Sequence, residues 1–201
     1  MSSESKVAKI GPLFMLKHFS QFILSVCIVM LTACSAYNIE SIPTSRVTMV
    51  TSGDLSSVAK TYAWHASMFS VHTANKIDEQ TLKTQLRDSV DKIMAEKGYL
   101  VVNTTDSPQM TIGFGMALAS EMSDAEILAK AGLVPGLATQ GVDSEHEKGS
   151  VLIALFNPIV EQPFWRVLAQ GFTEPDNNMA QREARFDNLA RMMLNSVPKA
   201  D

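Results

Sequence analysis

Two long segments of the chain repeat apolar residues with the period of an α-helix. In residues 78–97 the apolar side chains recur every three or four positions and share one helix face; they are Leu82, Leu86, Val90, Ile93 and Met94. Residues 178–196 have the same spacing, and their apolar face consists of Phe186, Leu189, Ala190, Met193 and Leu194. Gly98 and Pro198, which follow the two segments, are residues that end helices. The pattern predicts two long amphipathic helices.

Shorter segments have the alternating or continuous apolar character of β-strands. They are residues 46–51, 60–64, 99–102, 110–118, 151–156 and 164–170. The last two are separated by a short turn with Asn157-Pro158 and are expected to pair as a hairpin. The capping box Ser123-Asp124-Ala125-Glu126 predicts a further, short helix that ends near Lys130. We therefore expect an α+β fold, with a mostly antiparallel sheet and the two long helices packed on one face.

The predicted strand 110–118 has two unlike faces. One face carries bulky apolar side chains, namely Ile112, Phe114, Met116 and Leu118. The other face is nearly bare, because it consists of Gly113, Gly115 and Ala117. A bare strand face occurs where a ligand or another backbone approaches closely. It indicates either a ligand groove over the glycines, or helix-to-sheet packing or a sheet bend, and we favour the second interpretation.

An apolar run near the beginning of the chain is typical of a signal peptide. Residues 22–31 form this run, which is shorter than the about 20 apolar residues that cross a bilayer. It ends in Leu31-Thr32-Ala33-Cys34, the pattern of a bacterial lipoprotein signal that is cleaved before the cysteine. Lys17 precedes the run, and because Met15 would begin a signal of ordinary length, Met1 and Met15 are both candidate starts.

This interpretation divides the chain into three parts. We expect a lipoprotein signal peptide in residues 1–33, a lipidated tether in residues 34–45 and a single α+β domain in residues 46–198. Lipid on Cys34 would attach the protein to a membrane. Ser35, which is not aspartate, favours the outer membrane, so that the domain would face the periplasm.

Charge and cysteine content exclude several classes of partner. Cleavage before Cys34 removes three of the basic residues and one acidic residue, so that 14 basic and 20 acidic residues leave a net charge of −6. An acidic chain without a run of Lys or Arg lacks the electrostatic footprint of a nucleic-acid-binding protein. Cys27 lies in the expected signal and Cys34 would carry lipid, so we expect neither thiol chemistry nor a cysteine-ligated metal in the domain.

No recognisable catalytic or metal-binding motif emerges from the remaining residues. His65 and His72 lack a carboxylate at a metal-ligand spacing, and Glu145-His146-Glu147 reads as a solvated loop. Gly113-x-Gly115 lacks the third glycine of a dinucleotide site and lies within a strand. We therefore predict no catalytic residues, no metal and no cofactor.

Trp165 and Arg166 are the candidate ligand-binding residues. Neighbouring residues of a strand point to opposite faces, so Arg166 would place a cation on one face and Trp165 an aromatic ring on the other. Arg166 would either bind an anion or form an ion pair with a helix carboxylate, and we favour the ion pair. Trp64 and Trp165 are interpreted first as core residues.

With these residues in place, the chain resembles a family of bacterial envelope lipoproteins that share a domain of unknown function, number 4136. The resemblance covers residues 46–198 and rests on five short motifs in order, namely Thr61-Tyr62-Ala63-Trp64, Glu96-Lys97-Gly98-Tyr99, Gly149-Ser150-Val151-Leu152-Ile153, Pro163-Phe164-Trp165-Arg166 and Ser196-Val197-Pro198. Many members have a glycine-rich middle, where this chain has the capped helix from Ser123 and Pro135-Gly136. The resemblance implies an α+β domain and a lipoprotein, and it brings no catalytic residues.

Two functions follow as expectations. The first is a non-enzymatic binding or assembly module that is anchored to the membrane and serves another envelope protein. The alternative is an envelope enzyme of the hydrolase type, which would need polar groups such as His65, His146 and Arg166 to converge in one pocket.

Overall fold

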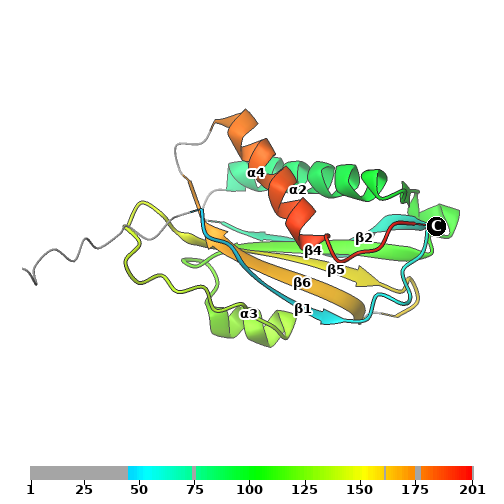
Figure 1. Ribbon diagram of the computed structural model, residues 1–201, viewed down its shortest axis with the longest axis horizontal. Helices are drawn as coiled ribbons and strands as arrows, with labels where there is room; N and C mark the ends of the chain where they lie inside the picture. The colour runs from blue at the N-terminus through cyan, green and yellow to red at the C-terminus, as the bar shows by residue number, and fades with distance from the viewer. Residues whose placement is uncertain (1–44, 74–75, 161, 175–177, 201) are drawn as a thin grey trace, which may run out of the picture. The chain divides into compact units, whose positions relative to one another are not determined.

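A mixed β-sheet forms the centre of the domain (Figure 1). The computed structural model describes residues 45–73, 76–160, 162–174 and 178–200, so the expected signal peptide and Cys34 lie outside the described residues. Within those residues six strands pair in the order β1-β6-β5-β4-β2-β3. Their bounds are β1 Thr48–Gly53, β2 Thr61–His72, β3 Leu100–Val101, β4 Met110–Leu118, β5 Lys148–Phe156 and β6 Pro163–Phe172.

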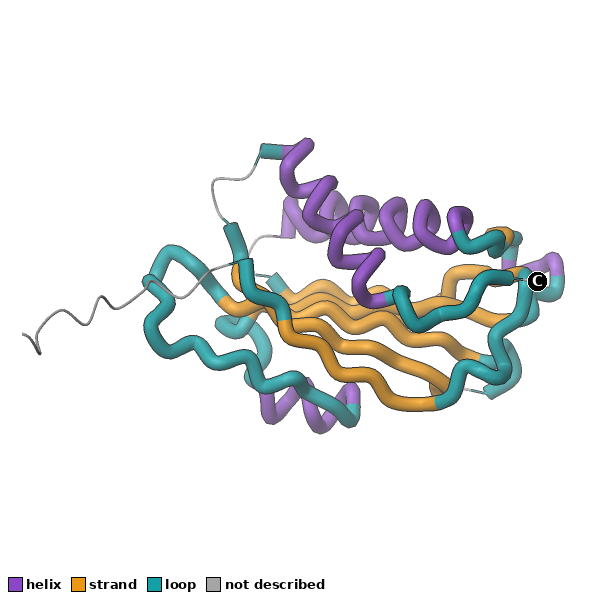
Figure 2. The backbone as a smooth tube through the Cα atoms, in the orientation of Figure 1, coloured by secondary structure: helices purple, strands orange, loops and turns teal. Residues whose placement is uncertain are grey.

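The described residues also form three α-helices and one turn of 3₁₀-helix. They are α2 Lys76–Glu96, α3 Asp124–Ala131, α4 Met179–Met193 and the 3₁₀ turn η2 Thr104–Asp106. Helices α2 and α4 cover one face of the sheet, and α3 lies on the opposite face (Figures 1 and 2). Within the described residues, no helix has both the length and the apolar character needed to span a bilayer.

The expected sheet and helix arrangement is wrong in two respects. The strands β4, β5, β6 and β1 pair antiparallel, but β2 is parallel to both of its neighbours, β3 and β4. The parallel pairs arise because α2 carries the chain back along the sheet after β2, so that the next strands run in the same direction. The second error concerns the helices, since α3 covers the face that the expectation left open.

The larger core lies between the sheet and the two long helices. Leu86, Val90, Ile93 and Met94 of α2 are at most 1% exposed, as their spacing predicted. Gly98 adopts a left-handed conformation with φ of 90° and ends α2 at the predicted place. Burial of these apolar faces supplies most of the free energy that holds the helices on the sheet.

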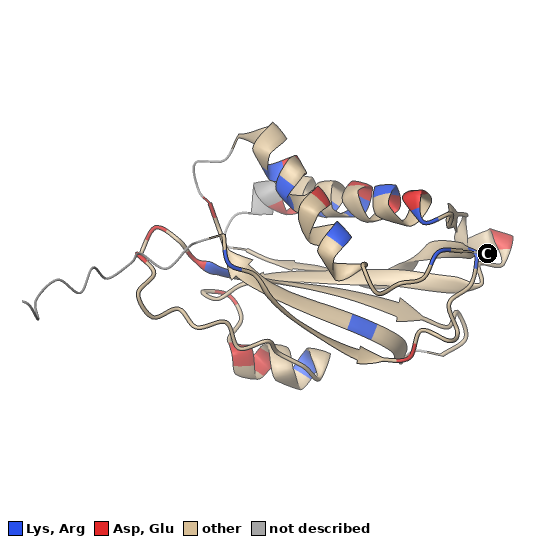
Figure 3. Ribbon diagram, in the orientation of Figure 1, with Lys and Arg blue, Asp and Glu red and all other residues tan. Residues whose placement is uncertain are grey.

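Polar contacts join α2 to α4 where the two helices meet. The Asp187 carboxylate of α4 accepts hydrogen bonds from Ser89 at 2.7 Å and from Lys92 at 2.5 Å. Arg191 forms a two-pronged ion pair with Glu96 at 2.6 and 3.0 Å. Acidic and basic residues lie along the outside of both helices in Figure 3, as expected of a solvated helix face.

Candidate functional site

A network of polar side chains holds the first turn of α3 on the sheet. The Gln170 side chain of β6 is fully buried; its Oε1 accepts the Leu137 N–H at 2.9 Å and its Nε2 donates to Asp124 at 2.8 Å and to Ser150 at 3.1 Å. Lys148 also donates to Asp124, at 2.7 Å. Although partial burial alone would raise the pKa of Asp124, the hydrogen bonds from Lys148 and Gln170 hold it below its ordinary value. The network fixes the first residue of α3 above β5 and β6.

The capping box predicted from the sequence begins α3. The Ser123 hydroxyl accepts the Glu126 N–H at 3.3 Å, and the Glu126 carboxylate accepts the Ser123 N–H at 2.9 Å. Ile127 and Ala131 then turn toward the sheet and pack in a second apolar cluster with Ala117 and Leu168. The helix ends at Gly132, whose φ of 70° is left-handed.

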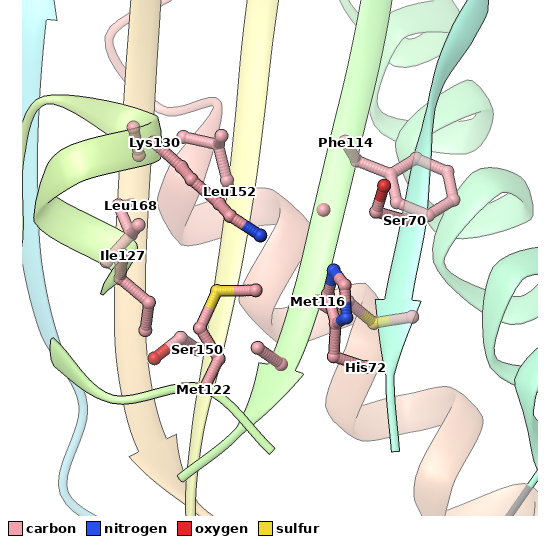
Figure 4. A pocket seen from close by; sticks show the side chains of 13 residues that line it. Ser70, His72, Phe114, Met116, Met122, Ile127, Lys130, Ser150, Leu152 and Leu168 are labelled. Atoms are coloured by element: carbon pink, nitrogen blue, oxygen red, sulfur yellow. The ribbon is translucent and has the colours of Figure 1, made fainter. Parts of the chain in front are cut away.

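A pocket of about 200 Å³ lies between α3 and the sheet (Figure 4). It lies over the bare face of β4, where Gly115 and Ala117 belong to its lining. A Cβ atom built on Gly115 would meet nothing nearer than the Ser70 carbonyl oxygen, at 3.8 Å. Helix-to-sheet packing, the interpretation that we favoured, is therefore found, because α3 packs over this face. A pocket remains above Gly115.

The lining of the pocket is mainly apolar and includes a few polar groups. Its apolar side chains come from α3, β4, β5, β6 and the loop before α3, and include Met122, Ile127, Ala131, Leu152 and Leu168. The polar groups are Ser70 and His72 of β2, Ser150 of β5 and Lys130 of α3. In Figure 4 the Lys130 amine extends from α3 over the pocket toward β4, and the His72 ring faces the same space.

This arrangement favours the binding of a small, largely apolar molecule. Pockets for small molecules are lined mainly by apolar side chains with a few polar groups that orient the ligand. The lining contains no carboxylate among the described residues. Nor do the described residues contain a cluster of three or more His, Cys, Asp or Glu side chains that could hold a metal ion.

The two candidate ligand-binding residues lie on opposite faces of β6, as their alternation predicted. Trp165 is 3% exposed and belongs to the core beneath α2 and α4, so its ring contributes to packing. Arg166 lies on the α3 face, where its guanidinium occupies the space beside Gly132 at the end of the helix. Within the described residues Arg166 forms no ion pair, so the helix carboxylate that we expected is not found there.

The three residues proposed for an enzymatic site do not converge. The His65 ring contacts that of Phe156, with centroids 4.8 Å apart, at the end of β5. His146 binds Asp143 at 2.7 Å just before the start of β5, so the two histidines are separated by the length of that strand, about 25 Å. Arg166 lies on β6, and the order β6-β5-β4-β2 places its strand about 14 Å from β2.

The remaining candidate motifs, Glu145-His146-Glu147 and Gly113-x-Gly115, lie in or beside the strands β4 and β5. Glu147 in the Glu145-His146-Glu147 segment accepts the Ser120 N–H at 2.7 Å, which holds the end of β4 beside the start of β5. Gly113 and Gly115 both lie within β4, and Gly115 lines the pocket. His72, which we had considered only as a metal ligand, also lines the pocket.

The sequence did not single out Asp91, which joins α2 to β2. Its Oδ1 accepts hydrogen bonds from the Tyr62 hydroxyl at 2.5 Å and from the Trp64 indole N–H at 3.1 Å. Arg87 approaches the same carboxylate at 3.8 Å and lies over the Trp64 ring. Burial raises the pKa of Asp91, and the hydrogen bonds and Arg87 oppose this only in part. The available signal was that Tyr62 and Trp64, two residues apart, share a strand face and each needs an acceptor.

Two of the family motifs, Glu96-Lys97-Gly98-Tyr99 and Ser196-Val197-Pro198, meet at the end of the chain. The Tyr99 hydroxyl donates to the Pro198 carbonyl at 2.9 Å, and the Lys97 ammonium donates to the Val197 carbonyl at 2.6 Å. The Ala200 N–H in turn donates to the Lys97 carbonyl at 2.8 Å. Residues of these two motifs therefore make contacts between distant parts of the sequence. These contacts hold the C-terminal segment beside the end of α2.

Several solved structures resemble this one at low sequence identity. PelC from Paraburkholderia phytofirmans, solved as a dodecamer, is 9% identical with a TM-score of 0.48, over 78% of this chain and 99% of that chain. A DUF4136 family protein from Bacteroides thetaiotaomicron is 12% identical with a TM-score of 0.46, over 76% of this chain and 98% of that one. A PDZ domain protein from Parabacteroides distasonis is 14% identical with a TM-score of 0.45, over 78% and 36% of the two chains. Since each TM-score is below 0.5, these similarities support no conclusion about function.

The family resemblance seen in the motifs is confirmed by a wider comparison. No curated protein matches the chain. The model of one family, described as a domain of unknown function, matches residues 50–199, about three quarters of the sequence. On this match the chain belongs to the DUF4136 family.

Proposed function

We propose that this chain is an outer-membrane lipoprotein whose periplasm-facing domain is a non-enzymatic binding module. The anchor would be lipid on Cys34, added after cleavage of residues 1–33. The cleavage pattern Leu31-Thr32-Ala33-Cys34 supports this part of the proposal, and Ser35 supports the outer membrane. Two or more acyl chains would be needed for stable anchoring.

The pocket beneath α3 is the proposed ligand site. The observation that carries the proposal is an apolar cavity of about 200 Å³ over the bare backbone of Gly115, with Lys130 and His72 at its edge. The pocket is open to solvent, so its apolar lining is in contact with water, and covering that lining with apolar ligand atoms is favourable. A ligand that fills the pocket would remove this surface from water and supply the missing packing contacts. In an assembly module, this ligand would come from another envelope component.

The non-enzymatic form is preferred because of how the polar groups are distributed. His65, His146 and Arg166 lie apart, and the pocket combines an imidazole and an ammonium with hydroxyl groups but with no carboxylate among the described residues. A triad-like site needs a base that a third group orients. The hydrolase alternative therefore gains no observation in its favour.

The ligand site can be tested with the methyl group of Met122, which lines the pocket. Benzene is titrated into protein labelled with [¹³C]methyl-methionine, and the Met122 signal is assigned with Met122→Leu. Gly115→Leu would fill the cavity, whereas Gly149→Leu adds the same side chain to β5, where a Cβ meets only Leu118 at 3.7 Å. We expect a saturable Met122 shift in the wild type and in Gly149→Leu, and none in Gly115→Leu. An equal shift in all three proteins would exclude the pocket as the site.

The anchor is tested by labelling cells with radioactive palmitate. The wild type and Cys27→Ala should incorporate label and fractionate with the outer membrane, whereas Cys34→Ala should remain an unlabelled precursor. Equal labelling of the wild type and Cys34→Ala would contradict the assignment of the lipid to Cys34.

A further inference from the structure

We infer that the pocket beneath α3 binds an anionic amphiphile with a short apolar tail, such as a medium-chain acyl carboxylate. The inference rests on the proposed function, since it names the class of ligand for the same pocket. It is carried by the size of the cavity, the apolar lining and the position of one cation, Lys130.

The volume limits the length of the tail. An apolar protein cavity of about 150 Å³ holds benzene, so by proportion about 200 Å³ accommodates roughly eight carbon atoms. Each methylene buried against Ile127, Leu152 and Leu168 should raise the affinity about fourfold. Met122 adds an adaptable side chain that can follow the shape of a flexible tail.

The cation at the opening determines the charge of the head group. Lys130 is exposed, and within the described residues it forms no ion pair. The acidic groups of the same helix are engaged elsewhere, since Glu126 caps Ser123 and Asp124 binds Lys148 and Gln170. In Figure 4 the Lys130 amine extends over the cavity. Glu126 lies one turn before Lys130 and attracts it at longer range, but no direct ion pair joins the two, so a carboxylate bound there would meet a cation whose direct contacts are open among these groups.

Two further groups, His72 and Arg166, favour a negatively charged head group. The His72 ring lies across the pocket from α3 and can donate a hydrogen bond to an anion (Figure 4). The Arg166 guanidinium lies beside Gly132, two residues beyond Lys130, and adds positive potential at that end of the helix. The lining contains no carboxylate among the described residues, so a cationic head group would find no partner.

The test uses the mature lipidated protein in phosphatidylcholine nanodiscs and isothermal titration calorimetry, with titrations into empty nanodiscs subtracted. Octanoate should bind saturably at one site. Octyltrimethylammonium, which has the same tail and the opposite charge, should bind at least about tenfold more weakly, because a charge-assisted hydrogen bond is lost. Acetate, which lacks the tail, should give no saturable heat.

Variants separate the head-group contact from the cavity. Lys130→Met should weaken octanoate about tenfold or more and leave the binding of octanol unchanged. Lys60→Met, which removes the same charge from an exposed position at the start of β2, should change neither. Gly115→Leu should abolish the binding of octanoate and octanol, and Gly149→Leu should not.

The outcomes distinguish this inference from the proposed function. If octyltrimethylammonium binds as tightly as octanoate, or Lys130→Met leaves octanoate unchanged, the anionic class is wrong, while loss of binding in Gly115→Leu would keep the pocket as a ligand site. If no octyl probe binds in a manner that Gly115→Leu abolishes, both the inference and the assignment of the pocket as the ligand site fail.

Discussion

The Asp91 carboxylate offers the sharpest test of how α2 is held on the sheet. It is the acceptor for two buried donors of β2, Tyr62 at 1% and Trp64 at 7% exposure. Asp91→Ala would leave both donors without this acceptor, and each unsatisfied buried donor costs about 1–3 kcal/mol. Because the variant also removes a partly buried charge, we expect a net loss of about 2–4 kcal/mol in the free energy of unfolding.

Asp91→Asn separates the acceptor from the charge. Tyr62 and Trp64 both donate to Oδ1, so an amide oxygen in that position keeps both hydrogen bonds. The variant loses two contacts of Oδ2: the longer hydrogen bond from the Trp64 indole N–H, at 3.3 Å, and the approach of Arg87, whose Nε lies at 3.8 Å and whose side chain is 51% exposed. Because Trp64 keeps its bond to Oδ1 and an exposed ion pair contributes little, this loss is small. The Asn variant should therefore stay within about 1 kcal/mol of the wild type.

The raised pKa of Asp91 also predicts how the stability of the folded protein depends on pH. Since burial raises the pKa of Asp91 above its ordinary value of 3.8, the folded protein binds this proton more tightly than the unfolded chain does. The stability that Asp91 contributes by binding this proton is thus fully present when the pH lies below the ordinary pKa of the unfolded chain. It is lost as the pH rises through the raised pKa of the folded protein. Relative to Asp91→Asn, the wild type should gain stability when the pH falls from 7 toward 4.

Urea unfolding followed by tryptophan fluorescence measures these differences, and Asp88→Ala is the matched control. Asp88 is exposed on the same helix, and its removal should change stability by less than about 0.5 kcal/mol. If Asp91→Asn were as damaging as Asp91→Ala, the carboxylate would matter for its charge, and the acceptor argument would be refuted. A loss below about 0.5 kcal/mol for Asp91→Ala would refute it equally.

Three further predictions concern the two faces of the sheet. Leu86→Ala, at a fully buried site in α2, should cost roughly 2–5 kcal/mol in urea unfolding, and a change below about 0.5 kcal/mol would contradict the core assignment. Gly115→Ala should raise the free energy of unfolding by about 0.4–1 kcal/mol, because the new Cβ has room and the unfolded chain loses freedom; a destabilised variant would show that the cavity is not open there. Gln170→Leu should cost about 2–4 kcal/mol and expose the Leu137 N–H to hydrogen exchange, since a buried donor loses its acceptor; unchanged protection would contradict the proposed seating of α3.

The sequence determined the elements whose signals are local. The spacing of Leu82, Leu86 and Val90 predicted which face of α2 is buried, and Gly98 predicted where the helix ends. The capping box of Ser123 and Glu126 predicted the start of α3. These features depend on residues within a few positions of each other, because helix periodicity and capping are properties of a short stretch of backbone.

The candidate site could be predicted only in part for a related reason. The alternation in residues 110–118 indicated that Gly115 lies on a bare face, but it could not say which element covers that face. The covering helix is set by Gln170 and Asp124, which are 46 residues apart in sequence and meet only in the folded chain. His72 and Lys130 reach the same pocket from different elements for the same reason.

Tertiary structure alone decided the parallel pairs of β2 and the partners of the buried polar groups, whereas the hairpin of β5 and β6 could be predicted from its short turn. Local alternation specifies that a segment is a strand, but parallel or antiparallel pairing depends on how the chain returns, and α2 returned it parallel to β2. Likewise nothing in the sequence distinguishes Asp91 from the other charged residues of its helix, because its contacts with Tyr62 and Trp64 form only in the folded chain. The sequence by itself therefore determined the helices, most of the strands and their buried faces, whereas contacts between distant residues decided the sheet order, the position of α3 and the pocket beneath it.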